Sequence, residues 1–113
     1  MAQEQHQWAQ AEQYYQKALQ IKIEFKDGYA QASTYGLLGL LAKQRRQWPQ
    51  AQQYLLQALE IFHDAGDEHS GGIALRSLAW RWQASGDATL PAAVAPILGT
   101  TVGEVEKQLR ALP

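Results

Sequence analysis

The segment QWPQAQQYLLQALEI, residues 47–61, repeats with few changes a segment that the chain already carries at residues 7–21, QWAQAEQYYQKALQI. At this offset of 40 residues, Trp8 aligns with Trp48 and Tyr14 aligns with Tyr54. A fixed period of this length is the sequence signature of a stacked repeat. The chain of 113 residues shows no sustained alternation of apolar and polar residues, so the sequence predicts an all-α fold.

The repeated unit has the pattern of an amphipathic helix. In the second copy the apolar positions follow a period of 3.6 residues, which predicts one buried stripe. These positions are Ala51, Tyr54, Leu55, Ala58, Leu59 and Phe62. Pro49 suits the first helical turn, and Gly66 is expected to end the helix. The pair Asp27-Gly28 is expected to end the first copy in the same way.

Two further segments, 29–46 and 69–85, are predicted to be the partner helices of these copies. Residues 37–42, LLGLLA, are apolar nearly all round, so we expect this helix to be covered on several sides. The predicted order is therefore one B-type helix, an A-type helix, a second B-type helix and a second A-type helix. Short turns join successive helices.

The A–B unit of residues 35–58 resembles the tetratricopeptide repeat (TPR). The matching residues are Tyr35, Leu38-Gly39, Ala51 with Leu55, and Ala58. Ala42, Leu55 and His63 depart from the family pattern, and the longer period resembles kinesin light chains and bacterial multi-repeat signalling proteins. HEAT repeats share the longer period, but the Leu-Gly and spaced alanines favour TPR. The resemblance implies a right-handed α-solenoid of antiparallel helix pairs.

The two ends depart from the repeat. We expect residues 1–86 to form TPR-like repeats, the first of them reduced to its B helix, and residues 87–113 to form a C-terminal helical cap. In the cap, Pro91 and Gly99 bound a short helix, and Thr101 and Glu104 predict a capping box before a helix at 101–112. Its predicted apolar face is Val102, Val105, Leu109 and Leu112. A small helix-turn-helix is the alternative interpretation of this segment.

Composition narrows the classes of function. The formal net charge is −1, which argues against a general nucleic-acid or anionic-membrane surface. There is no cysteine, so thiolate metal sites and cysteine nucleophiles are excluded. HDAGDEH, residues 63–69, is the one metal-like cluster, but a polar turn explains it as well. We expect no cofactor, no enzymatic activity and a cytoplasmic location.

By the resemblance, one side of the A helices lines a concave groove that binds a partner. The residues implied are Ser33, Gly36, Leu40 and Lys43 in one repeat and Ile73, Arg76, Trp80 and Gln83 in the next. Trp80 could instead lie beneath the C-terminal cap, and both interpretations stay open. Trp8 and Trp48, at the same repeat position, are expected to serve in packing.

Two functions of different kinds follow. The first is a scaffold that binds a peptide or protein segment in the groove, with Lys43 and Arg76 pairing with carboxylates and Leu40 and Trp80 making apolar contact. The alternative is a self-assembly module that forms a homodimer through the apolar face of helix 7–26, including Tyr14, Tyr15 and Phe25.

Overall fold

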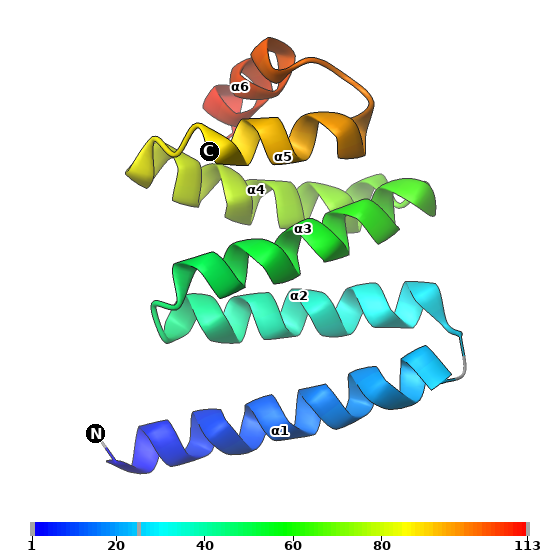
Figure 1. The fold of residues 1–113 in the computed structure, drawn as a ribbon, viewed down its shortest axis with the longest axis vertical. Coiled ribbons are helices and arrows are strands. Elements are labelled where there is room, and N and C mark those ends of the chain that lie inside the picture. The colour runs from blue at the N-terminus through cyan, green and yellow to red at the C-terminus, as the bar shows by residue number, and fades with distance from the viewer. Residues whose placement is uncertain (1, 25, 113) are drawn as a thin grey trace.

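The computed structural model describes the backbone of residues 2–24 and 26–112, and the side chains from Gln7 onward within those ranges. These residues form helices and turns and contain no strand, so the predicted all-α class is confirmed (Figure 1). The helices are α1 (Ala2–Glu24), α2 (Gly28–Gln44), α3 (Trp48–Asp64), α4 (Glu68–Ser85), α5 (Thr89–Leu98) and α6 (Val102–Ala111).

Successive helices stack along the long axis of the molecule, from α1 at one end to α6 at the other (Figure 1). The molecule measures 41 × 36 × 20 Å. A helix rises about 1.5 Å per residue, so the width is close to the length of α1. Packed helices lie about 8–10 Å apart, so the thickness corresponds to two helices. The arrangement is that of a helical repeat solenoid, as predicted.

Left-handed residues recur every 20 positions at the ends of the first four helices. They are Lys26 (φ 55°), Arg46 (φ 58°), Gly66 (φ 74°) and Gly86 (φ 66°). At the first three, the N–H of the following residue donates to the carbonyl five residues earlier, with an N···O distance of 2.9 Å. The recurring hydrogen bond shows that these three turns have the same geometry although the residue types differ.

The prediction that Asp27-Gly28 ends the first helix is wrong in one respect. The left-handed residue there is Lys26, at the repeat position of Gly66, while Gly28 is the first residue of α2. Asp27 instead caps α2, because its carboxylate accepts a hydrogen bond from the N–H of Ala30 at 3.0 Å. Asp67 caps α4 in the same way, so the two aspartates, 40 residues apart, have equivalent roles in the two repeats.

A tight helix contact lies between α2 and α3, at Gly39. A Cβ atom added to Gly39 would lie 2.9 Å from Cγ of Leu55, closer than van der Waals contact allows. The neighbouring Ala51 and Ala58 are buried as well. The small residues quoted for the family resemblance therefore stand where the two helices approach each other most closely.

The expectation that residues 37–42 are covered on several sides is wrong for two of them. Leu38 and Leu41 are buried, but Leu37 and Leu40 are 45% and 43% exposed. Neighbouring helices cover only the side of α2 that carries Leu38, Gly39 and Leu41. An apolar strip of α2 is left open along its other side.

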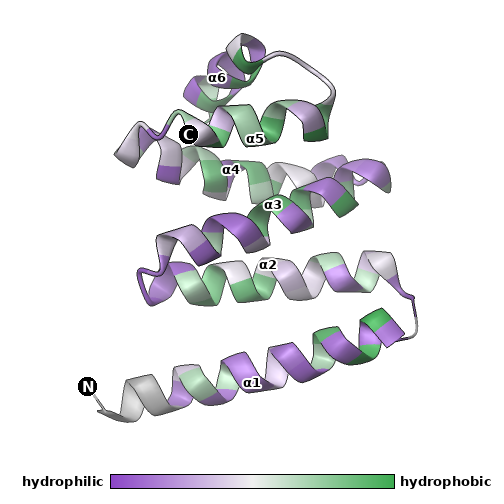
Figure 2. Cartoon of the chain, viewed as in Figure 1, coloured by the Kyte–Doolittle hydropathy of each residue, from purple (hydrophilic) through white to green (hydrophobic). Residues whose placement is uncertain are grey.

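The predicted C-terminal helices are present, and they pack on the last repeat. Apolar residues dominate α5 (Figure 2), and Leu90, Val94, Val105 and Leu109 are fully buried in one cluster with Leu78 of α4. Thr101 caps α6 as predicted, since its hydroxyl accepts from the N–H of Glu104 at 3.2 Å. Val102 is exposed, contrary to prediction, because the first turn of α6 projects past the cluster. No helix in the described part of the chain is long and apolar enough to cross a membrane.

A hydrogen bond joins the starts of α2 and α4. The hydroxyl of Tyr29 donates to Oδ2 of Asp67, and the ring of Tyr29 contacts Phe62 edge to face at 5.7 Å. The bond from Tyr29, followed by the bonds from Ser70, lowers the pKa of Asp67 from 3.8 to about 2. The same bond raises the pKa of Tyr29. This link connects equivalent helices of two successive repeats.

Replacing Gly39 by leucine should destabilise the fold by roughly 1–3 kcal/mol, because the new side chain must displace Leu55. Gly36→Leu is the matched control on the same helix, since a Cβ there meets nothing within 4 Å. The control should be neutral or stabilising, because leucine favours a helix more than glycine. Urea unfolding followed by circular dichroism measures both, and equal midpoints would contradict the close approach.

Replacing Lys26 or Arg46 by glycine should stabilise the protein. A left-handed conformation costs an L-residue about 1–2 kcal/mol, and glycine avoids this cost. Part of the gain is lost, because glycine has more conformational freedom in the unfolded chain. We therefore expect a gain of about 0.5–1 kcal/mol for each change. Thermal unfolding measures it, with Gly66→Lys as the reverse change. A lower melting temperature for Lys26→Gly would show that its side chain stabilises the turn in another way.

Replacing Tyr29 by phenylalanine should make stability less dependent on pH in acid. The depressed pKa of Asp67 contributes stability that is fully present above the unfolded value of 3.8 and is lost as the pH falls toward about 2. Phenylalanine keeps the ring but removes the largest cause of the shift. The difference in urea midpoint between wild type and variant should therefore be larger at pH 6 than at pH 2. A difference that is constant with pH would exclude the link.

Candidate functional site

A hollow of about 200 Å³ lies between α2 and α4, with α3 as its floor. We call it the groove. It is lined by Ser33, Gly36, Leu37 and Leu40 of α2, by Leu55, Ala58 and Phe62 of α3, and by Ser70, Ile73, Ala74 and Ser77 of α4. Because α2 and α4 are equivalent helices one repeat apart, the groove runs across the boundary between two repeats.

The surface of the groove is apolar with small polar groups between. Leu37, Leu40 and Ile73 are 45%, 43% and 50% exposed. Each of them projects from the edge of a helix into the open space. Exposed apolar side chains that gather in one concave surface are typical of interaction sites.

Two tryptophans and two cations close one end of the groove. The rings of Trp48 and Trp80 lie 5.7 Å apart, and Nζ of Lys43 lies 4.4 Å from the centre of the Trp80 ring. The guanidinium of Arg81 lies 4.8 Å from the Trp48 ring. We call these four residues the tryptophan stack. A small second hollow beside it shares Leu55 and Ser77 with the groove, so the two features are continuous.

The two cations of the stack differ in what surrounds them. Arg81 lies near Asp87, whose pKa is lowered by the hydrogen bonds from Thr89 and, to a smaller extent, by Arg81. Among the described residues, Lys43 forms no ion pair, and its described contact is the face of Trp80. A cation over an indole ring retains most of its charge for a further partner. Lys43 is therefore the cation best able to meet an incoming carboxylate.

The residues that the resemblance implied fall into four groups. Ser33, Gly36, Leu40 and Ile73 all line the groove. Lys43 and Trp80 belong to the tryptophan stack, and Arg76 is exposed on α4.

Gln83 lies away from both features. Its amide donates to the carbonyls of Leu109 and Leu112 at 2.8 and 3.2 Å, so it ties α4 to α6.

The position of Trp80 separates the two interpretations that the sequence left open. Trp80 is 47% exposed and contacts Trp48 and Lys43 at the end of the groove. Trp82, two residues later, is the tryptophan that packs against the cluster shared with α5 and α6, with Arg110 over its ring at 5.7 Å. Trp80 and Trp82 point to different sides of α4 because two residues of a helix differ by about 200°.

Sequence reasoning missed seven residues of the groove and two of the stack. They are Leu37, Leu55, Ala58, Phe62, Ser70, Ala74 and Ser77 in the groove, and Trp48 and Arg81 in the stack. The sequence pattern could have identified Leu37 and Ser77, because the offset of 40 relates them. Each also lies four residues, about one helical turn, after a predicted groove residue, Ser33 or Ile73. Nothing in the periodicity indicated that Trp48 would reach Trp80. That contact depends on how α3 crosses α4 in three dimensions.

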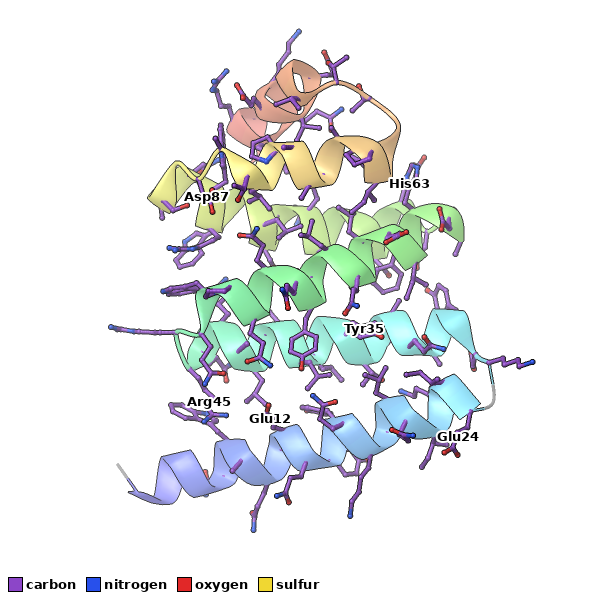
Figure 3. All side chains as sticks on the ribbon, in the orientation of Figure 1. Glu12, Glu24, Tyr35, Arg45, His63 and Asp87 are labelled. Carbon is purple, nitrogen blue, oxygen red and sulfur yellow. The ribbon has the colours of Figure 1, made fainter. Side chains whose placement is uncertain are left out.

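The polar segment 63–69 spans the end of α3, the turn at residues 65–67 and the start of α4. His63 is exposed near the end of α3 (Figure 3), and the carboxylate of Asp67 is engaged by Tyr29 and by the N–H of Ser70. Within the described residues, no group of three histidine, aspartate or glutamate side chains could hold a metal ion. The hydrogen bonds of Asp67 account for the acidic residue at this position.

Comparison with known protein families agrees with the helical repeat geometry. The sequence model described as tetratricopeptide repeat matches residues 1–64, more than half of the chain. No curated protein and no solved structure matches. The matched range contains α1, α2 and α3, and with them the close contact at Gly39. The chain belongs to the tetratricopeptide repeat family.

Proposed function

We propose that this chain is a protein-binding scaffold whose groove holds a segment of a partner protein. Tetratricopeptide repeats generally mediate protein–protein interactions and are typically not catalytic. The single observation that carries the proposal is the open apolar surface between α2 and α4, where Leu37, Leu40 and Ile73 remain exposed although the rest of the repeat is well packed.

The partner segment carries at least one large apolar side chain. Burial of apolar surface contributes roughly 25 cal/mol per Å², so covering three half-exposed aliphatic side chains supplies much of the binding free energy. The three groove serines, Ser33, Ser70 and Ser77, add hydroxyls that can satisfy polar groups of a bound backbone. Trp80 provides a flat apolar surface at one end, of the kind that contributes strongly in interfaces.

The partner segment also carries carboxylates beside its apolar residue. Lys43 lies at the end of the groove without a carboxylate of its own among the described residues, and Arg76 is exposed on the adjoining helix. A carboxylate near Lys43 would form a charge-assisted hydrogen bond next to the Trp80 ring. We therefore favour an acidic segment with a central leucine or phenylalanine.

The division of the chain into repeats and a C-terminal cap is consistent with an open groove. We propose residues 1–86 as the repeats and residues 87–113 as the cap that closes them. In support, α5 and α6 bury Leu90, Val94, Val105 and Leu109 against α3 and α4 and leave the groove side of α4 open. Repeat arrays need such an end, because the last repeat would otherwise expose its core to water.

Synthetic peptides test whether the groove prefers an acidic or a basic partner segment. A 12-residue peptide with a central Leu-Phe pair flanked by aspartates should quench or shift the emission of Trp48 and Trp80. The same peptide flanked by lysines should bind at least about tenfold more weakly, because like charges then face Lys43. Ile73→Glu should abolish binding, and Lys43→Glu should weaken it by about tenfold. Fluorescence titration measures the affinity of the wild type for each peptide and of both variants for the aspartate-flanked peptide.

Val102→Glu is the matched control, since Val102 is an exposed apolar side chain on α6, away from the groove. It should bind the acidic peptide as wild type does. Equal binding of Ile73→Glu and Val102→Glu would place the peptide elsewhere. Equal affinity for both peptides would remove Lys43 from the proposal and leave an apolar groove without charge preference.

A further inference from the structure

The side of α1 that faces away from α2 carries an ordered set of residues. Tyr14, Lys17, Ile21 and Glu24 follow one another at intervals of three, four and three, which places them on one helix face. We call this the outer face of α1. Tyr14 is 69% exposed and Ile21 is 54% exposed. Figure 3 shows Glu24 directed away from the stack, and Figure 2 shows hydrophobic residues near the C-terminal end of α1.

Of the four equivalent residues one repeat later, Tyr54 and Ile61 are partly buried against other helices, whereas Gln57 and Asp64 are exposed. Tyr54, equivalent to Tyr14, stacks on the ring of Tyr35 at 6.3 Å and accepts a hydrogen bond from Gln16 at 2.8 Å. Ile61, equivalent to Ile21, packs against the cluster that contains Phe62. The repeat therefore uses this face to contact a helix. On α1 the same residue types stand exposed to solvent.

The charges of the outer face are arranged so that the face complements itself. Lys17 and Glu24 lie on either side of Ile21, about 6 Å and 4.5 Å away along the helix axis. When two such helices meet antiparallel about a twofold axis at Ile21, Lys17 of each lies opposite Glu24 of the other. A symmetric dimer requires a patch of this self-complementary kind. Within the described residues, neither Lys17 nor Glu24 forms an ion pair in its own chain.

We propose that a second copy of this chain covers the outer face of α1, through an antiparallel α1–α1 contact with twofold symmetry. Ile21 of one copy packs on Ile21 of the other, and two Lys17–Glu24 pairs flank this centre. Tyr14, seven residues before Ile21, lies about 10 Å from this centre along the helix axis, beyond Glu24 at the end of the opposite α1, and so flanks the central contact. The groove lies between α2 and α4, so both copies keep it open, and the dimer presents two grooves.

Charge reversal provides a test that does not depend on disrupting the fold. Lys17→Glu alone should weaken the dimer by at least about tenfold, because each Lys17–Glu24 pair becomes a pair of carboxylates. Glu24→Lys alone should weaken it similarly, by pairing two cations. A one-to-one mixture of the two variants restores two opposite-charge pairs and should dimerise as wild type does. Sedimentation equilibrium on the 113-residue chain measures all four samples.

Lys107→Glu, an exposed reversal on α6, is the control and should leave the dimer unchanged. Circular dichroism confirms that each variant is folded. A wild-type monomer at 200 µM, on the order of the concentration at which weak dimers form, would overturn the proposal. So would a dimer that survives both single reversals, or two monomeric variants that stay monomeric when mixed.

Discussion

The close approach of α2 and α3 at Gly39 is the contact on which the rest of the structure depends. Only a residue without a side chain lets Leu55 reach the backbone of α2. Leu55 belongs at once to the core cluster, to the floor of the groove and to the small hollow beside the tryptophan stack. The depth of the groove is therefore set by the same contact that holds the repeat together, which couples stability and the binding surface.

The periodic turns carry this local geometry along the chain. The left-handed residues Lys26, Arg46 and Gly66, 20 positions apart, reverse the helix direction with the same hydrogen bond, so the turn between α3 and α4 repeats the turn between α1 and α2. At two of these three positions the residue is lysine or arginine, which shows that the turn is imposed by the packed helices and not only by local preference. The resulting solenoid places the equivalent faces of α2 and α4 on either side of one groove.

The sequence predicted the helices, their order and most of the close contacts, because the offset of 40 residues aligns them without knowledge of the structure. The resemblance to the tetratricopeptide repeat implied four of the groove residues, Ser33, Gly36, Leu40 and Ile73. The sequence did not predict that Leu37 is exposed, because a run of apolar residues looks the same in an enclosed helix and in a helix that borders a groove. For Leu40, the apolar run and the resemblance pointed in opposite directions, and the groove position implied by the resemblance agrees with its exposure. The contact of Trp48 with Trp80 depends on a helix crossing that no periodicity encodes.

Nuclear magnetic resonance of the four tryptophan indole N–H groups tests most directly whether the groove is the binding surface. The four tryptophans report on three regions, since Trp8 lies on α1, Trp48 and Trp80 form the stack, and Trp82 packs toward the cap. On addition of the aspartate-flanked peptide, the account predicts shifts for Trp48 and Trp80 and none for Trp8 and Trp82. Shifts confined to Trp8 or Trp82 would contradict it.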